Sequence, residues 1–183
     1  MASSVAPAVS HWKIDPAHTL VEFAVKHMVI ATVKGRFGGV SGEIRMDEEE
    51  IARSELDVAI EAASIDTRND QRDAHLRSAD FLDAATHPTL TFRSRRVEPG
   101  KDRHIRVIGD LTIRGTSIEV ALDVELLGRN KSPYGQQVAA FHATTTVNRQ
   151  DWGLKWNQAL ETGGFLVGDD VKITVDAEAI LET

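Results

Sequence analysis

Apolar and polar residues alternate along most of this chain, which is the pattern of strands that bury one face. Between residues 18 and 28, Val21, Phe23 and Val25 fall on one face, and His27 ends that row. The pattern recurs in residues 39–47, 54–62, 88–98, 104–115, 117–128, 137–148 and 170–181. We therefore predict about eight strands, several of which would exceed roughly 30 Å in length.

Residues 67–88 break the alternation. Asn69 can cap a helix, and Pro88 marks a stop before the next strand. We expect a short helical segment near residues 70–83, with Leu76, Phe81 and Leu82 on its apolar side, and a second short turn or helical piece at residues 148–157. A helix at the mouth of a barrel would act as a plug or lid.

Strands of this length can pair as a sandwich or close as a barrel. Turn residues between consecutive segments favour antiparallel hairpins, and closure removes exposed edges, so we predict an all-β barrel. An eight-stranded barrel is wide enough to be filled by side chains or to hold one slim ligand. The inward residues are mostly of middle size, apart from Phe23, Phe92 and Phe37. Both a filled barrel and a ligand cavity stay open on this reasoning.

Length and composition narrow the class of protein. The 183 residues fit a single domain over residues 11–183, preceded by a flexible tail at residues 1–10. The formal net charge of −7 argues against a nucleic-acid or anionic-membrane partner. No stretch is apolar enough for an integral membrane segment, and the N-terminal residues do not read as a secretory signal, so we expect a cytoplasmic protein.

Catalytic and metal-binding motifs are not evident. The chain has no cysteine, and its seven histidines are scattered, so we expect no metal and no cofactor. The segment from Asp66 to Asp80 is rich in carboxylates and could hold an acid–base pair. A surface helix with favourable first-turn charges and solvated Arg72 and Arg77 is the preferred interpretation.

Two residues near strand ends have two possible roles each. Arg149 could meet the anionic or carbonyl head of a ligand, or it could pair with Asp151 or a neighbouring carboxylate and pin a corner. His27 could donate to a polar head group, or it could bond to backbone near the rim. The structural role is the preferred one in both cases.

Six stretches stand in the order found in the YceI-like family, which the chain resembles from about Trp12 to the last strand. They are WKIDPAHTLVEFAVKHM, VKGRF, SIDTRNDQRDAHLRSADFLD, HPTLTFRS, GDLTIRG and VNRQDWG. The resemblance implies an extended antiparallel eight-stranded lipocalin-like barrel with a short helical cap, a tunnel for a polyisoprenoid lipid, and a homodimer. Many members carry a secretory signal, which this sequence does not show. Val40 stands where Phe is frequent in the family and, if inward, would widen the tunnel.

On this basis we predict that the protein binds, stores or transports a long-chain polyisoprenoid lipid, of the polyprenyl quinone or polyprenyl phosphate class, and is not an enzyme. The predicted ligand-binding residues are Phe23, Val25, His27, Phe37, Val58, Phe81, Leu82, Phe92, Phe141, Arg149 and Trp152. Two alternatives remain: an isomerase or cyclase acting on an apolar substrate, and a filled barrel that acts as a stress-related interaction module.

Overall fold

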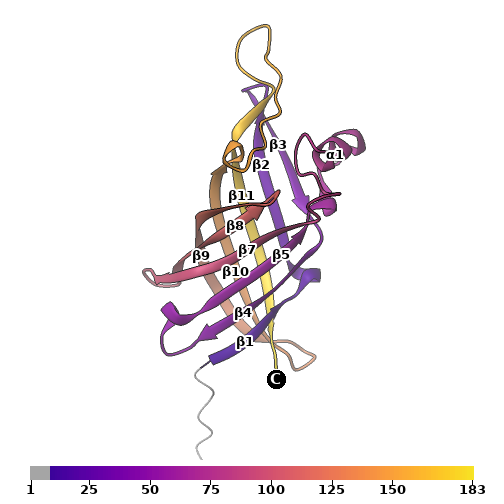
Figure 1. The fold of residues 1–183 in the computed structure, drawn as a ribbon. Coiled ribbons are helices and arrows are strands. Elements are labelled where there is room, and N and C mark those ends of the chain that lie inside the picture. The colour runs from indigo at the N-terminus through magenta and orange to yellow at the C-terminus, as the bar shows by residue number, and fades with distance from the viewer. Residues whose placement is uncertain (1–8) are drawn as a thin grey trace, which may run out of the picture.

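The computed structural model describes residues 9–183, and strands dominate it (Figure 1). The strands are β1 (Val9–Ile14), β2 (Leu20–His27), β3 (Ala31–Phe37), β4 (Val40–Asp47), β5 (Glu55–Glu61), β6 (Ile65–Asp66), β7 (Thr89–Pro99), β8 (His104–Ile113), β9 (Thr116–Lys131), β10 (Gln137–Asn148) and β11 (Val167–Leu181). The helices are α1 (Asp70–Arg77) and the short 3-10 turns η1 (Pro16–His18), η2 (Ile51–Arg53), η3 (Ala62–Ser64) and η4 (Arg149–Trp152).

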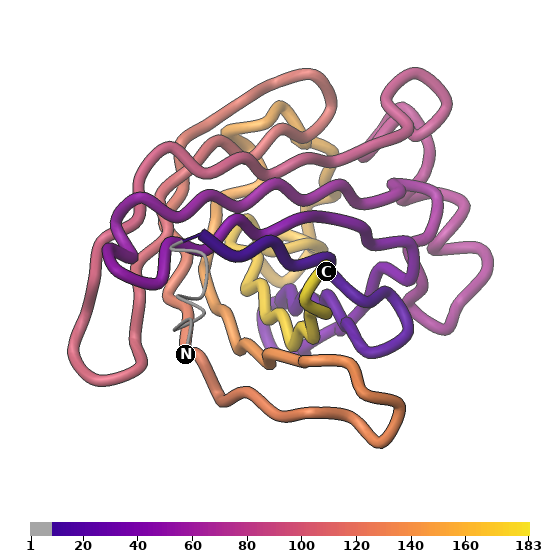
Figure 2. The backbone as a smooth tube through the Cα atoms, turned by 90° about the horizontal axis from the view of Figure 1, so that it is seen from below, coloured from indigo at the N-terminus to yellow at the C-terminus, as the bar shows by residue number. Residues whose placement is uncertain are grey.

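All strand pairs are antiparallel, and the sheet closes on itself because β1 pairs with both β4 and β11. The closed ring contains eight strands in the order β1, β4, β5, β7, β8, β9, β10 and β11. Figure 1 shows them wrapping obliquely around one long axis, and Figure 2 views the same barrel from below, where the C-terminus lies. The predicted antiparallel eight-stranded barrel is therefore confirmed.

The structure contains three strands that the sequence pattern did not indicate: β1, β3 and the two-residue β6. Along β11, β1 pairs with the C-terminal end and β2 with the N-terminal part, so together they form one broken strand of the wall. The break is η1, which Asp15 caps by accepting a hydrogen bond from the amide of Ala17. Because β1 begins at Val9, two residues of the predicted tail belong to the barrel, and residues 1–8 of that tail lie outside the described part of the chain.

Side chains alternate across the wall as the pattern predicts. On β7, Leu90 and Phe92 are buried while Thr91 and Arg93 are exposed. The β7–β8 ladder changes register between Ser94 and Arg96, and this irregularity returns Val97 to the inside. A bulge adds one residue without losing the apolar face, which a strict alternation of two cannot describe.

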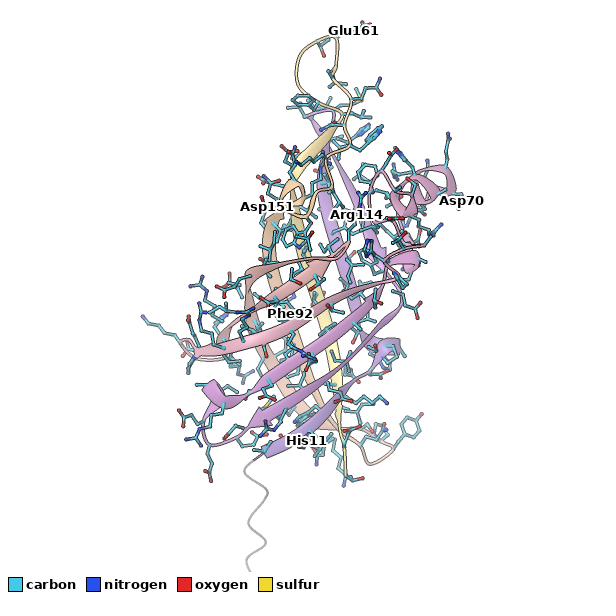
Figure 3. The ribbon with its side chains drawn as sticks, viewed as in Figure 1. His11, Asp70, Phe92, Arg114, Asp151 and Glu161 are labelled. Atoms are coloured by element: carbon cyan, nitrogen blue, oxygen red, sulfur yellow. The ribbon has the colours of Figure 1, made fainter. Side chains whose placement is uncertain are left out.

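Helix α1 lies beside the upper end of the barrel, where Figure 3 labels Asp70. Asn69 caps it as predicted, accepting from the amide of Arg72 at 2.9 Å. Leu76, Phe81 and Leu82, in the helix and the turns that follow it, line the cavity inside the barrel, so this segment is the short helical cap. No helix within residues 9–183 is both long and apolar enough to cross a bilayer.

The prediction that Arg72 and Arg77 are solvated is wrong. Arg72 donates to the hydroxyl and the carbonyl of Thr67, and Arg77 donates to the carbonyls of Ala63 and Ile65. A helix of eight residues is marginal by itself. These bonds tie it to the carbonyls of the chain in and around the short strand β6.

Candidate functional site: an apolar cavity inside the barrel

A cavity of about 310 Å³ lies within the barrel and extends from η2 and Ser54 near one end to Leu154 and Val167 near the other. Its volume is at the lower end of the range for small-molecule sites. Besides predicted residues, it is lined by Ile44, Met46, Leu56, Ile60, Leu90, Val97, Val107, Leu111, Val120, Leu122, Val124, Ala143, Val147, Ile173 and Val175. This wall is apolar along its whole length and offers contact area rather than hydrogen bonds.

Ten of the eleven predicted ligand-binding residues line this cavity: Phe23, Val25, Phe37, Val58, Phe81, Leu82, Phe92, Phe141, Arg149 and Trp152. Figure 3 shows Phe92 about midway along the barrel wall. Phe141 is buried, and its neighbour His142 lies on the other face, 2.7 Å from Asp176. That these residues contact a ligand stays a prediction.

His27 is the predicted residue that does not line the cavity. It pairs with Val167 and Ala31 near the end of β2, and its side chain is half-buried. The β2–β11 ladder is irregular between Val167 and Val171. The register between β2 and β3 is unbroken from Val25 to His27, so the lining of the cavity ends before His27 although the alternation continues.

Arg149 is buried at 6 % exposure, and its guanidinium is fully engaged with the protein. Its five N–H groups donate to the carbonyls of Gly168, Leu154, Trp156 and Val167 and to the carboxylate of Asp169. Burial lowers the pKa of Arg149, and the charge of Asp169 opposes that shift. This geometry agrees with the predicted structural role, in which Arg149 fixes a corner of the chain. The carboxylate that it pairs with is that of Asp169 rather than Asp151.

Aromatic rings pack together around the cap at the upper end of the barrel. Trp152 is 2 % exposed, and its indole N–H donates to the carbonyl of Leu111 at 2.9 Å. The ring of His75 packs edge-on against Phe81 and Trp156, with centroids 5.1 and 4.6 Å away. The sequence prediction missed His75 and Trp156, because their contact joins the cap to a loop 81 residues later in the chain.

Small residues shape the wall where two phenyl rings meet. Phe23 and Phe37 lie with ring centroids 5.7 Å apart, and the ring of Phe23 covers Gly35 on the neighbouring strand. A side chain at Gly35 would occupy the space of that ring. Val40 is buried and lines the cavity, so its smaller side chain leaves room that a phenyl ring would fill.

Among the described residues, the titratable ones that line the cavity are Glu22, Glu55 and Arg149. Glu55 is bound to Arg45 at 3.2 Å in an exposed pair, and alternation along β2 turns Glu22 to the outer face. Within residues 9–183, no buried side-chain nitrogen or oxygen lacks a hydrogen-bond partner. The cavity thus presents no paired acid and base to a ligand.

The carboxylates of the cap have structural partners. Asp73 is buried and accepts hydrogen bonds from the amide and the hydroxyl of Thr67, and Asp80 lies 2.8 Å from His75. Asp66 accepts from Arg36 and from the amide of Arg68, and these bonds hold the pKa of Asp66 below its usual value. The arrangement agrees with the structural interpretation of this segment.

One group of potential metal ligands, Asp15, His18 and Glu178, lies at the break between β1 and β2. The Nδ1 atom of His18 lies 2.7 Å from a carboxylate oxygen of Asp15 and 3.9 Å from one of Glu178. The hydrogen bond between Asp15 and His18 lowers the pKa of Asp15 and raises that of His18. Capping of η1 accounts for the placement of Asp15 without an ion.

Known proteins are similar to this chain in sequence and in fold. A UPF0312 protein of Staphylococcus aureus is 38% identical over 171 residues, which are 93% of this chain and 97% of that protein. The crystal structure of a Campylobacter jejuni YCEI protein is 31% identical, covers 86% of this chain and 90% of its own, and superposes with a TM-score of 0.73. Burkholderia cenocepacia BcnA shares the fold with a TM-score of 0.79 at 23% identity, over 90% and 98% of the two chains.

A more distant structure is described as a polyisoprenoid binding domain from Saccharophagus degradans. It has a TM-score of 0.66 at 17% identity and covers 95% of this chain and 99% of its own, so it shows a shared fold. The model of the YceI-like domain matches residues 12–179, nearly all of the barrel. With the closed antiparallel barrel, its helical cap and these matches together, the chain belongs to the YceI-like family.

Proposed function

We propose that the protein binds a long-chain polyisoprenoid lipid in the barrel cavity and holds it for storage or transport. The observation that carries this proposal is the cavity itself, enclosed by strands and lined with apolar side chains from end to end. The description of a related barrel as a polyisoprenoid binding domain supports the same ligand class.

An apolar wall selects a ligand by burial and shape. A polyprenyl tail offers no hydrogen bonds, so each square ångström that leaves water contributes about 25 cal/mol, less the cost of ordering the chain. Tail length and branching, rather than polar contacts, would therefore decide affinity.

The head group would remain outside the apolar part of the cavity. Arg149 is not available to hold it, because its five N–H groups already donate to protein oxygens. We assign no reaction to the cavity, since the titratable residues at its border are paired or turned outward. The protein would thus be a carrier rather than an enzyme.

Solvent extraction of the native protein, followed by mass spectrometry of the extract, tests the proposal. A polyprenyl species at about one per chain supports it and identifies head and tail. If the extract is empty, purified protein is titrated with a polyprenyl quinone and with a straight-chain alkyl quinone of equal carbon number. Absence of uptake, or equal uptake of the two, would contradict a polyisoprenoid site.

A further inference from the structure

Four exposed apolar residues form a cluster at the upper end of the molecule, which we name the apolar tip: Met28, Val29, Ile30 and Phe165. Val29 is 62 % exposed and Ile30 is 82 % exposed. The first three form the turn between β2 and β3, and Phe165 comes from the loop that precedes β11. Such a cluster on a protein in water marks a surface that contacts something else.

The backbone of this turn has a conformation that its residues do not favour. Met28 and Val29 adopt φ angles of 51° and 68°. Gly and Asn adopt positive φ angles more readily than other residues, and a β-branched residue is strongly disfavoured there. Neither side chain is buried in return. A strained turn whose apolar side chains remain exposed points to a role outside the protein.

The two loops of the tip hold one another in place. The amide of Met28 donates to the carbonyl of Leu166 at 2.9 Å. Gly164 lies so close to Val29 that a Cβ atom added at Gly164 would be 2.9 Å from the Cγ2 atom of Val29. Phe165 is therefore presented beside the β2–β3 turn, and the tip is a single surface with a defined shape.

The tip also continues the apolar lining of the cavity. Val25 and Val167 line the cavity, while Met28 and Phe165 lie three residues and two residues farther along the same two segments. At about 3.3 Å per residue the distance along the chain is roughly 10 Å. A lipid leaving the cavity at this end would meet the tip next.

We propose that the apolar tip docks on the surface of a phospholipid bilayer. A convex apolar loop suits a bilayer, which yields around it, whereas a protein partner would need a matching pocket. The charges near the tip are mixed, with Lys26 exposed and Glu161 at the apex of the loop (Figure 3). The docking would therefore be shallow, at the level of the head groups, and would not require anionic lipid.

Flotation with phosphatidylcholine vesicles tests the docking, with wild-type protein expected to float. The double variant Met28→Asn, Val29→Gly relieves the strain of the turn and removes its apolar side chains. We expect it to unfold at a higher temperature and to bind vesicles at least tenfold more weakly. Ile30→Ser should also weaken binding. A wild type that stays unbound, or tip variants that float like it, would overturn the proposal.

Tyr134→Ser is the matched control, since Tyr134 is 91 % exposed but lies in the hairpin at the opposite end of β11. It should float like the wild type, and an equal loss would show that binding is not specific to the tip. Sedimentation of the same variants tests whether the tip instead binds a second copy of this chain. Tip variants that lose a dimer and keep vesicle binding would overturn the proposal.

Delivery of a polyisoprenoid through the tip rests on the proposed function, whereas docking does not. Uptake of a polyprenyl quinone is therefore measured from vesicles and from a dilute dispersion without vesicles. The double variant Met28→Asn, Val29→Gly should take up the quinone from vesicles at least tenfold more slowly and from the dispersion at an unchanged rate. Equal rates from vesicles for the variant and the wild type would contradict delivery through the tip, while no uptake from either source would contradict the proposed function.

Discussion

The ring of Phe23 lies over Gly35 on the neighbouring strand, and the space above this glycine is what lets the ring rest against the wall of the cavity. Phe23 and Gly35 are directly paired across β2 and β3. Because Gly35 has no side chain, the ring of Phe23 can lie over it, and the position of that ring affects the width of the cavity.

Gly35→Ala should push the ring of Phe23 away from the wall, because the added methyl group would overlap the ring. Overpacking of this kind costs about 1–3 kcal/mol. We expect lower stability by that amount in urea unfolding and weaker uptake of long tails in ligand titration. Gly38→Ala is the control, since no heavy atom lies within 4 Å of the added group. Wild-type uptake by Gly35→Ala would show that this wall does not meet the ligand.

Phe92→Asp should abolish lipid uptake and lower stability by about 4 kcal/mol or more. Phe92 is 7 % exposed and lines the apolar cavity, where a carboxylate would be buried among apolar side chains. Phe92→Leu keeps an apolar side chain at that site and should retain uptake. Binding by the folded Asp variant equal to that of the wild type would contradict the inward position of Phe92.

Arg149→Lys should destabilise the protein almost as much as Arg149→Ala, by about 2–3 kcal/mol, although it keeps the charge. A lysine has three donors at one point and cannot reach carbonyls that the planar guanidinium bridges, so buried acceptors would be left unpaired. Chemical unfolding measures the loss. Arg96→Ala removes an arginine that is 55% exposed and paired with Glu98, and it should change stability by less than about 1 kcal/mol. Equal stability of Arg149→Lys and wild type would show that the bonds of the guanidinium are dispensable.

His27→Ala should leave uptake of the tail within about twofold of wild type, because His27 does not line the cavity. The same variant tests whether His27 contributes to head-group preference, by comparison of quinone and phosphate forms of one tail. Complete loss of binding in a folded protein would show that His27 contacts the ligand.

Low pH should decrease the stability of the folded protein, in part because Asp47 becomes protonated. Hydrogen bonds from the amides of Glu50 and Glu49 lower the pKa of Asp47, which favours the charged carboxylate in the folded protein. Its contribution to stability is present above the unfolded pKa of 3.8 and is lost as the pH falls through the lower folded pKa. In melting curves between pH 2 and 7, Asp47→Asn should melt at a lower temperature near neutral pH and show a shallower decline below pH 4. A decline equal to that of wild type would exclude this contribution.

The sequence alone determined the all-β class, the antiparallel pairing of successive strands, the helical cap with Asn69 at its start, and most of the inward residues. These features follow from local rules. Alternation assigns a face to each residue of a strand, so Phe92 and Phe141 could be placed from their neighbours alone. Capping likewise depends on residues within one turn.

Only the tertiary structure decided the features that depend on partners far along the chain. It showed β1 and β3 as parts of the wall, because pairing with β11 and β2 compensates for their weak patterns. It placed His27 outside the lining of the cavity, and it showed Arg149 bonded to carbonyls up to 19 residues away. Closure of a barrel and satisfaction of buried donors are properties of the whole chain, and no short window of sequence contains them.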